Sequence, residues 1–238
     1  MWYPENEQEL RDFIERSFEQ KIDLKPFPKK INGLIVPHAG YEYSGMIAGR
    51  AFSLLKNQGF EKAVILGPSH NIYLSGVCTS NLNEWNTSLG KIKLFNKDFP
   101  TGNIEKEHSI KNQVPFLQKL NFMEIIPLMV GNVKNEQAKE IAEKISKIDN
   151  CVYIFSTDLS HFYTYDKAVS NDKRTIEIIE NLDFDNFKFV NACGYFPLLI
   201  MMHLCKIFKT KPHLIEYKNS GDIIGNKNAV VGYAGLWF

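Results

Sequence analysis

The sequence predicts an α/β fold with three layers, in which helices cover both faces of a central, mixed and largely parallel sheet. Short apolar runs, typical of strands buried on both faces, alternate with longer segments whose apolar residues recur at helical spacing. The chain has 238 residues and no internal repeat, low-complexity tract or obvious linker. We therefore expect one domain spanning residues 1–238.

The expected buried strands are residues 33–37, 62–66, 123–130, 152–155 and 229–237. Residues 76–80 and 90–95 alternate more strongly and predict a hairpin or an edge insertion. Residues 213–218 predict a further strand. Antiparallel pairing is expected near the sheet edges and the C-terminal end.

Helical patterns cover residues 5–20, 44–59, 109–120, 135–149, 165–182 and 194–209. The pattern is clearest in 135–149, where the apolar residues fall on one face. Pro115 lies inside 109–120, so this helix should start late or kink.

The composition excludes several classes of protein. Lys and Arg number 28 against 27 Asp and Glu, a net charge of +1, which gives no reason to expect a nucleic-acid partner. The acidic start does not resemble a signal peptide, and the longest apolar run, residues 195–205, is shorter than the roughly 20 residues that a membrane span needs. Four cysteines without a CxxC pair favour a reduced, cytoplasmic protein.

Histidines follow three of the expected strands. His38 lies just after residues 33–37, His70 just after 62–66, and the stretch STDLSHF, with Asp158 and His161, follows 152–155. Ligands of open α/β sheets bind beyond the carboxyl ends of the strands. The sequence therefore predicts one site that collects these side chains.

Each of these side chains also has a simpler interpretation. His38, in PHAGYEYSG, is either a metal ligand or base, or it caps a turn. His70 follows Pro68, whose fixed φ pre-positions the imidazole for a metal, or it bonds to loop backbone. Asp158 and His161, three residues apart, act together, or Asp158 is an N-cap.

Cys193 precedes the apolar helix 194–209, where the helix dipole favours a thiolate that can act as a nucleophile or a metal ligand. Burial in the core is the alternative. Cys78, Cys151 and Cys205 have no such setting and are interpreted as core residues.

His108, in EHSIKNQ, is either an acid–base group of the site or a neighbour of Ser109, which caps the next helix. His203, inside an apolar helix, and His213, at the start of a strand, are interpreted as structural.

Six motifs appear in order: PHAGYEYSG, LGPSHN, EHSIKNQVPFLQ, STDLSHF, NACG and NSGDIIGNKNAVVGYAGLWF. In these motifs the chain resembles the Memo family, also called AmmeMemoRadiSam system protein B, from about residue 33 to the C-terminal end. The resemblance implies a fold like that of the class III extradiol dioxygenases. It also implies a metal held by His38, His70 and Cys193, with His161 and His108 lining the pocket and Asp158 supporting it.

The chain departs from the family pattern in two places. Tyr195 and Phe196 follow NACG, where relatives often carry smaller or basic residues, so we expect them to narrow the pocket mouth or to change its substrate. Lys111 stands where an acidic residue is common.

Two imidazoles and a thiolate suit Fe(II) or Cu(I), with Zn(II) possible, and three ligands leave coordination positions open.

Three functions are consistent with these residues. The first is a dioxygenase-like oxidoreductase in which His161 moves protons. The second is a hydrolase or transferase with Cys193 as nucleophile and His161 or His108 as base. The third is a non-catalytic binding or scaffold protein that uses the pocket for a small molecule or peptide. The family name adds radical-SAM and AMMECR-type proteins as partners.

Overall fold

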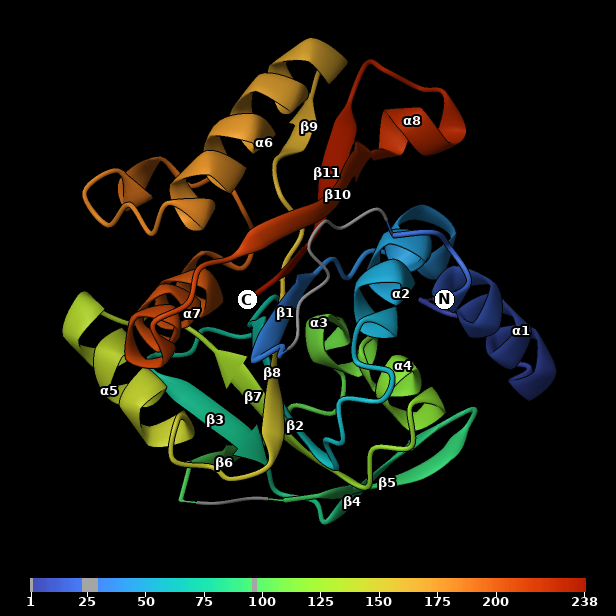
Figure 1. Cartoon of the computed structure of the whole chain (residues 1–238), viewed down its shortest axis with the longest axis vertical. Helices are drawn as coiled ribbons and strands as arrows, with labels where there is room; N and C mark the ends of the chain where they lie inside the picture. Colours follow the sequence, from blue (N-terminus) through green and yellow to red (C-terminus); the bar gives the residue numbers. More distant parts are fainter. Residues whose placement is uncertain (1, 23–29, 96–97) are drawn as a thin grey trace.

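The computed structural model describes residues 2–22, 30–95 and 98–238. It is an αβα arrangement in which a central sheet lies between two groups of helices (Figure 1). The predicted fold class is therefore confirmed.

Four neighbouring parallel strands form the middle of the sheet, in the order β1 (Gly33–Val36), β8 (Cys151–Ser156), β2 (Lys62–Pro68) and β7 (Glu124–Val130). Nearly every residue in them is buried, because helices cover both faces. Their carboxyl ends therefore point to the same edge of the sheet.

Antiparallel strands extend the sheet on both sides. β11 (Val230–Trp237) pairs with β1, and β10 (His213–Asn219) lies beyond it. On the other side, β3 (Val77–Ser80) pairs with β7, and β6 (Thr101–Gly102) pairs with β3. A short strand, β9 (His161–Tyr163), pairs with β11. The mixed character expected at the edges is thus confirmed.

Of the two alternatives for residues 76–80 and 90–95, the hairpin is wrong and the edge insertion agrees with the structure, since β3 adds to the outer side of β7. β5 (Gly90–Leu94) pairs with β4 (Glu84–Thr87), and the turn uses Gly90 at a φ of 101°, which glycine tolerates best. The sequence pattern misses β4 because Trp85 is its one buried residue.

Helices α1 (Glu7–Phe18), α2 (Met46–Ser53), α3 (His108–Lys111) and α4 (Val114–Lys119) cover one face of the sheet. Helices α5 (Asn135–Ile145), α6 (Tyr165–Glu180) and α7 (Tyr195–Phe208) cover the other face. A 3₁₀ turn, η2 (Phe187–Phe189), lies between α6 and α7. Figure 1 shows α5 and α7 opposite α1, α2 and α4. A short α8 (Ser220–Ile224) lies between β10 and β11.

Two of the helices differ from the sequence pattern for local reasons. The expected helix 109–120 is split into α3 and α4, with Pro115 in the first turn of α4, where its missing N–H costs nothing. A π-helical turn, η1 (Tyr41–Gly45), precedes α2. Within the described ranges, no helix is both long enough and apolar enough to cross a bilayer.

Candidate metal centre

Three strand ends bring their side chains to one place. His38 lies two residues beyond β1, His70 two residues beyond β2, and Asp158 two residues beyond β8. These strands are adjacent in the order β1, β8, β2, so the three side chains share one edge of the sheet. Cys193 reaches the same edge from the segment that leads into α7.

The contact between His38 and Cys193 forms the deepest part of the site. Nε2 of His38 lies 3.2 Å from Sγ of Cys193. The Asp158 N–H also points at this sulfur, 3.2 Å away. His38 is only 3% exposed, so any group that binds between the imidazole and the thiol is shielded from water on this side.

Hydrogen bonds fix the tautomer of His38. Its Nδ1 lies 2.9 Å from Oγ of Ser156. The Ser156 hydroxyl donates to the carbonyl of Ser109, and the side-chain amide of Gln113 donates to the same Oγ at 3.0 Å. The one proton of the hydroxyl is therefore used, and Nδ1 must donate to Ser156. The lone pair of His38 is left on Nε2, facing Cys193.

Burial keeps His38 neutral. Burial first, and the nearby His70 and His108 second, hold the pKa of His38 well below its usual value. A neutral imidazole is the form that binds a metal ion.

Glu107 accepts a hydrogen bond from Nδ1 of His70, as Ser156 does from Nδ1 of His38. The backbone N–H of His70 donates to Oε2 of Glu107 at 2.9 Å, and Nδ1 of His70 lies 2.8 Å from Oε1. Burial would raise the pKa of Glu107, but the bonds from His70 and the Ser109 N–H outweigh it and lower the pKa to about 2. The carboxylate is thus ionised, so Nδ1 of His70 donates, and in the neutral ring Nε2 carries the lone pair.

His108 completes a cluster of three imidazoles. Nitrogen atoms of His38, His70 and His108 lie within 4.8 Å of one another. The ring of His108 stacks on His70 at 4.5 Å between centroids, and on its other side on Trp2 at 4.0 Å. Burial and the neighbouring His70 lower the pKa of His108.

Asp158 and His161 occupy the segment that follows β8. Oδ1 of Asp158 accepts the backbone N–H of His38 at 2.8 Å, so Asp158 anchors the His38 loop rather than an imidazole. Nδ1 of His161 donates to the carbonyl of Leu159 at 2.8 Å, so in the neutral ring the lone pair is on Nε2. The segment contains no helical turn, so Asp158 is not an N-cap.

The expected thiolate at Cys193 is wrong for the metal-free chain. Burial, with the nearby Asp158 as a second cause, raises the pKa of Cys193 to about 12. The thiol is therefore protonated at neutral pH, and the desolvation of the sulfur outweighs the helix dipole that the sequence pattern suggests. Cys78, Cys151 and Cys205 are buried, as predicted.

Among the described residues, His38, His70 and His108 form the group whose donor atoms all lie within 4.8 Å of one another, and Cys193 stands at a ligand's distance from His38. Nitrogen and sulfur ligands of one metal, at roughly 2.1 and 2.3 Å, stand about 3.1–3.6 Å apart for angles between a right angle and the tetrahedral angle. The 3.2 Å between His38 and Cys193 lies in this range. The three imidazoles form a second possible ligand set, with His108 in place of Cys193.

The sequence patterns miss the residues that orient the ligands, namely Glu107, Ser156 and Gln113, and they also miss Trp2. Glu107 carries a signal, since it directly precedes His108 in the EHS motif. Ser156, in STDLSHF, and Gln113, in EHSIKNQVPFLQ, also lie in motifs, but their roles are not visible there, because their partners lie far away in the sequence.

Two separate hollows lie on the surface, one beside His108 and one beside Tyr195 and Phe196. A pocket of about 440 Å³ adjoins His108 and is lined also by Trp2, Lys106 and Lys111. Tyr195 and Phe196 line a different hollow, together with Phe184.

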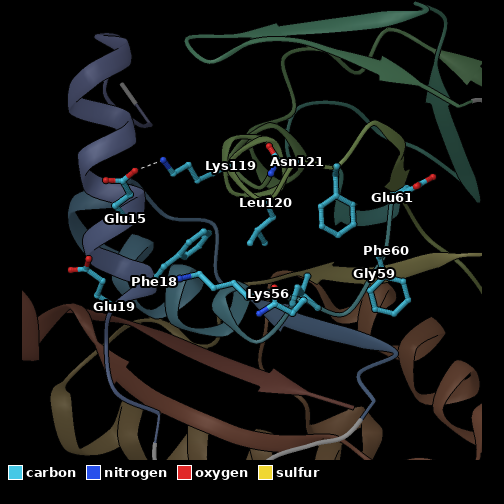
Figure 2. Close-up of a pocket in the computed structure, with 13 residues that line it drawn as sticks. Glu15, Phe18, Glu19, Lys56, Gly59, Phe60, Glu61, Lys119, Leu120 and Asn121 are labelled. Carbon is cyan, nitrogen blue, oxygen red and sulfur yellow. Dashed lines mark hydrogen bonds and ion pairs between the residues drawn. The ribbon is translucent and has the colours of Figure 1, made fainter.

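The most voluminous of the described hollows, about 630 Å³, lies at the opposite edge of the sheet (Figure 2). Gly59 to Glu61, just before β2, and Phe122, just before β7, line it. Figure 2 shows the Glu15–Lys119 ion pair on its wall. It contains none of the predicted site residues.

The fold and the cluster define a class of α/β protein with a histidine-rich group, able to hold a metal ion, at the carboxyl edge of a largely parallel sheet. A family model described as "Memo-like protein" matches residues 1–237. The chain belongs to this family.

Curated relatives agree with this assignment over their whole length. A "MEMO1 family protein" of Methanobrevibacter smithii is 36% identical and covers 98% of this chain and 95% of the relative. One of Sulfurisphaera tokodaii is 33% identical, with 100% and 96% covered, and one of Methanopyrus kandleri is 31% identical, with 100% and 95% covered.

Proposed function

We propose that this chain binds one Fe(II) or Cu(I) ion through His38, His70 and Cys193 and uses it as a dioxygenase-like oxidoreductase on a small organic substrate. The observation that carries the proposal is the pair of imidazoles whose Nδ1 atoms are held by Ser156 and Glu107. Both rings thereby keep an unprotonated Nε2 for a metal. Two imidazoles and one soft thiolate favour these metals over the hard cations Ca²⁺ and Mg²⁺.

The metal, when bound, supplies Lewis-acid and redox chemistry at its open coordination positions. The residues around the metal would hold it and exclude water from its inner side. His38 and Cys193 close the inner side, while His70 and His108 are partly open to solvent. In this proposal the substrate approaches from the side of His70 and His108, which is partly open to solvent.

His161 is the proposed proton carrier. Its Nδ1 proton is committed to the Leu159 carbonyl, so Nε2 is available to accept a proton from a substrate. His108 has a lowered pKa and is the second candidate, unless it ligates the metal in place of Cys193. Asp158 binds the His38 loop and does not transfer a proton itself.

The raised pKa of the Cys193 thiol argues against a cysteine hydrolase. A nucleophilic cysteine needs a lowered pKa, and burial raises the pKa of Cys193 to about 12. The same thiol suits a metal ligand, because a bound cation replaces its proton.

The test is an anaerobic titration of the metal-free protein with Fe(II), Cu(I) and Zn(II). Cys193→Ala and His70→Ala should each abolish tight one-to-one binding. His108→Ala distinguishes the two ligand sets: it spares binding if Cys193 is the third ligand and abolishes it if His108 is. His213→Ala, outside the site, is the matched control. Tight binding that survives both Cys193→Ala and His70→Ala would refute the assignment.

A further inference from the structure

The chain buries one carboxylate that the proposed chemistry does not use. Asp172, on α6, is fully buried, and no basic side chain pairs with it in the described part of the chain. Burial raises the pKa of Asp172, and its hydrogen bonds oppose this effect. An unpaired carboxylate is costly to bury, so its hydrogen bonds must serve something that an apolar residue could not.

Both oxygens of Asp172 accept hydrogen bonds from other elements. Oδ1 accepts the backbone N–H of Ser160 at 2.9 Å, and Oδ2 accepts the hydroxyl of Tyr217, on β10, at 2.8 Å. Gly232, on β11, makes room for the carboxylate, since a Cβ there would stand 2.0 Å from Oδ2. Three elements therefore meet at the segment that follows β8.

That segment is clamped along its length. The Leu159 N–H donates to the Gly232 carbonyl at 2.8 Å, and the Gly232 N–H donates to the Ser160 carbonyl at 2.9 Å. The Cys193 N–H donates to the Asp158 carbonyl at 3.2 Å. A shift of the Ser160 amide would therefore be passed on to the thiol and to Asp158.

The backbone next to His161 is strained. Phe162 has a φ of 63°, in the left-handed region that an aromatic residue avoids. Its side chain is 77% exposed and stands edge-on to the His161 ring, with 5.7 Å between the centroids. Phe162 is the extra residue of a bulge in the pairing of β9 with β11, where His161 pairs with Val231 and Tyr163 with Val230. The pairing with β11 imposes this conformation, and the Asp172 bond holds Ser160, the residue that leads into β9.

We propose that Asp172 is a positioning residue of the site: with Tyr217 and Gly232, it fixes residues 158–162 so that His161 directs Nε2 to the metal pocket. Asp172 touches neither metal nor substrate. The inference rests on the proposed function for the role of His161. It can be tested on the metal-free chain, so its failure and that of the metal site are distinguishable.

The experiment is ¹⁵N NMR of the histidine side chains in the metal-free protein. In the wild type, His161 should give a single tautomer with the proton on Nδ1. Asp172→Ala should lose this signature and give averaged or multiple His161 signals. Asp172→Asn should restore most of it, because the amide oxygen still accepts the Ser160 N–H. Glu177→Gln, on the exposed face of α6, is the control and should match the wild type.

Circular dichroism separates this role from a purely structural one. If Asp172→Ala folds with a lower Tm but keeps the wild-type His161 signature, the inference is refuted. If Asp172→Ala does not fold, Tyr217→Phe decides, since it removes one of the two bonds to the carboxylate. A shifted His161 signal in Tyr217→Phe supports the inference, and an unchanged one refutes it.

Discussion

Glu107 offers the sharpest test of how the site holds a metal. Its carboxylate accepts the backbone N–H and Nδ1 of His70 and the N–H of Ser109. In Glu107→Gln one oxygen becomes an NH₂ group, which cannot accept. At least one of the three bonds is lost, those that remain are no longer charge-assisted, and the hold on the Nδ1 proton of His70 is weaker.

The expected loss follows from that bond. A hydrogen bond to a charged group is worth about 1.5–3 kcal/mol, equivalent to roughly 10–100-fold in affinity. Removing the partner of a metal-binding histidine typically costs the same, about 10–100-fold. We expect Glu107→Gln to weaken metal binding by this factor.

The assay is a competition titration under anaerobic conditions, with thermal unfolding of the metal-free proteins alongside. Glu105→Gln makes the same change two residues away, at a side chain bonded to Ser80, and should bind like the wild type. Wild-type affinity in a folded Glu107→Gln would refute the view that Glu107 orients a ligand.

Three further outcomes are expected. Ser156→Ala removes the acceptor for Nδ1 of His38 and should weaken metal binding about tenfold, measured by the same titration. Metal affinity should rise about tenfold per pH unit in the neutral range, because Cys193, with its raised pKa, must release about one proton per ion. Calorimetric titrations in buffers of low and high ionisation enthalpy measure this proton release. A pH-independent affinity would exclude the thiolate as a ligand. Gly232→Ala should destabilise the fold by about 1–3 kcal/mol, because the added Cβ meets Asp172; an unchanged Tm would contradict this.

The arrangement of strands and helices is largely predictable because the buried strands are short apolar runs, and helix-period segments lie between most of them. The prediction fails where the alternation of apolar and polar residues does not match the burial of the strand. β4 buries one residue, Trp85, and therefore shows no strand pattern. Residues 77–80 alternate like half of a hairpin, yet they pair with β7, because β7 offers a long buried partner.

The positions of His38, His70 and His161 are predictable because parallel strands end at a common edge. Their orienting partners are not. Ser156 and His38 are 118 residues apart and Glu107 and His70 are 37 apart, so no local pattern links them. The ionisation of Cys193 is predicted in the wrong direction, since its burial is set by tertiary packing that no helix-end pattern encodes.

The contact of His38 with Cys193 spans 155 residues of chain, and its bond to Asp158 spans 120. Contacts between such distant segments form slowly, since the loop entropy must be lost before they do. Only the completed fold then presents the ligands together, and a metal at a hundredfold excess over its Kd would add about 2.7 kcal/mol to the native state. The cellular lifetime of the chain would then follow metal supply, with metal-starved molecules opening more often and reaching proteases first.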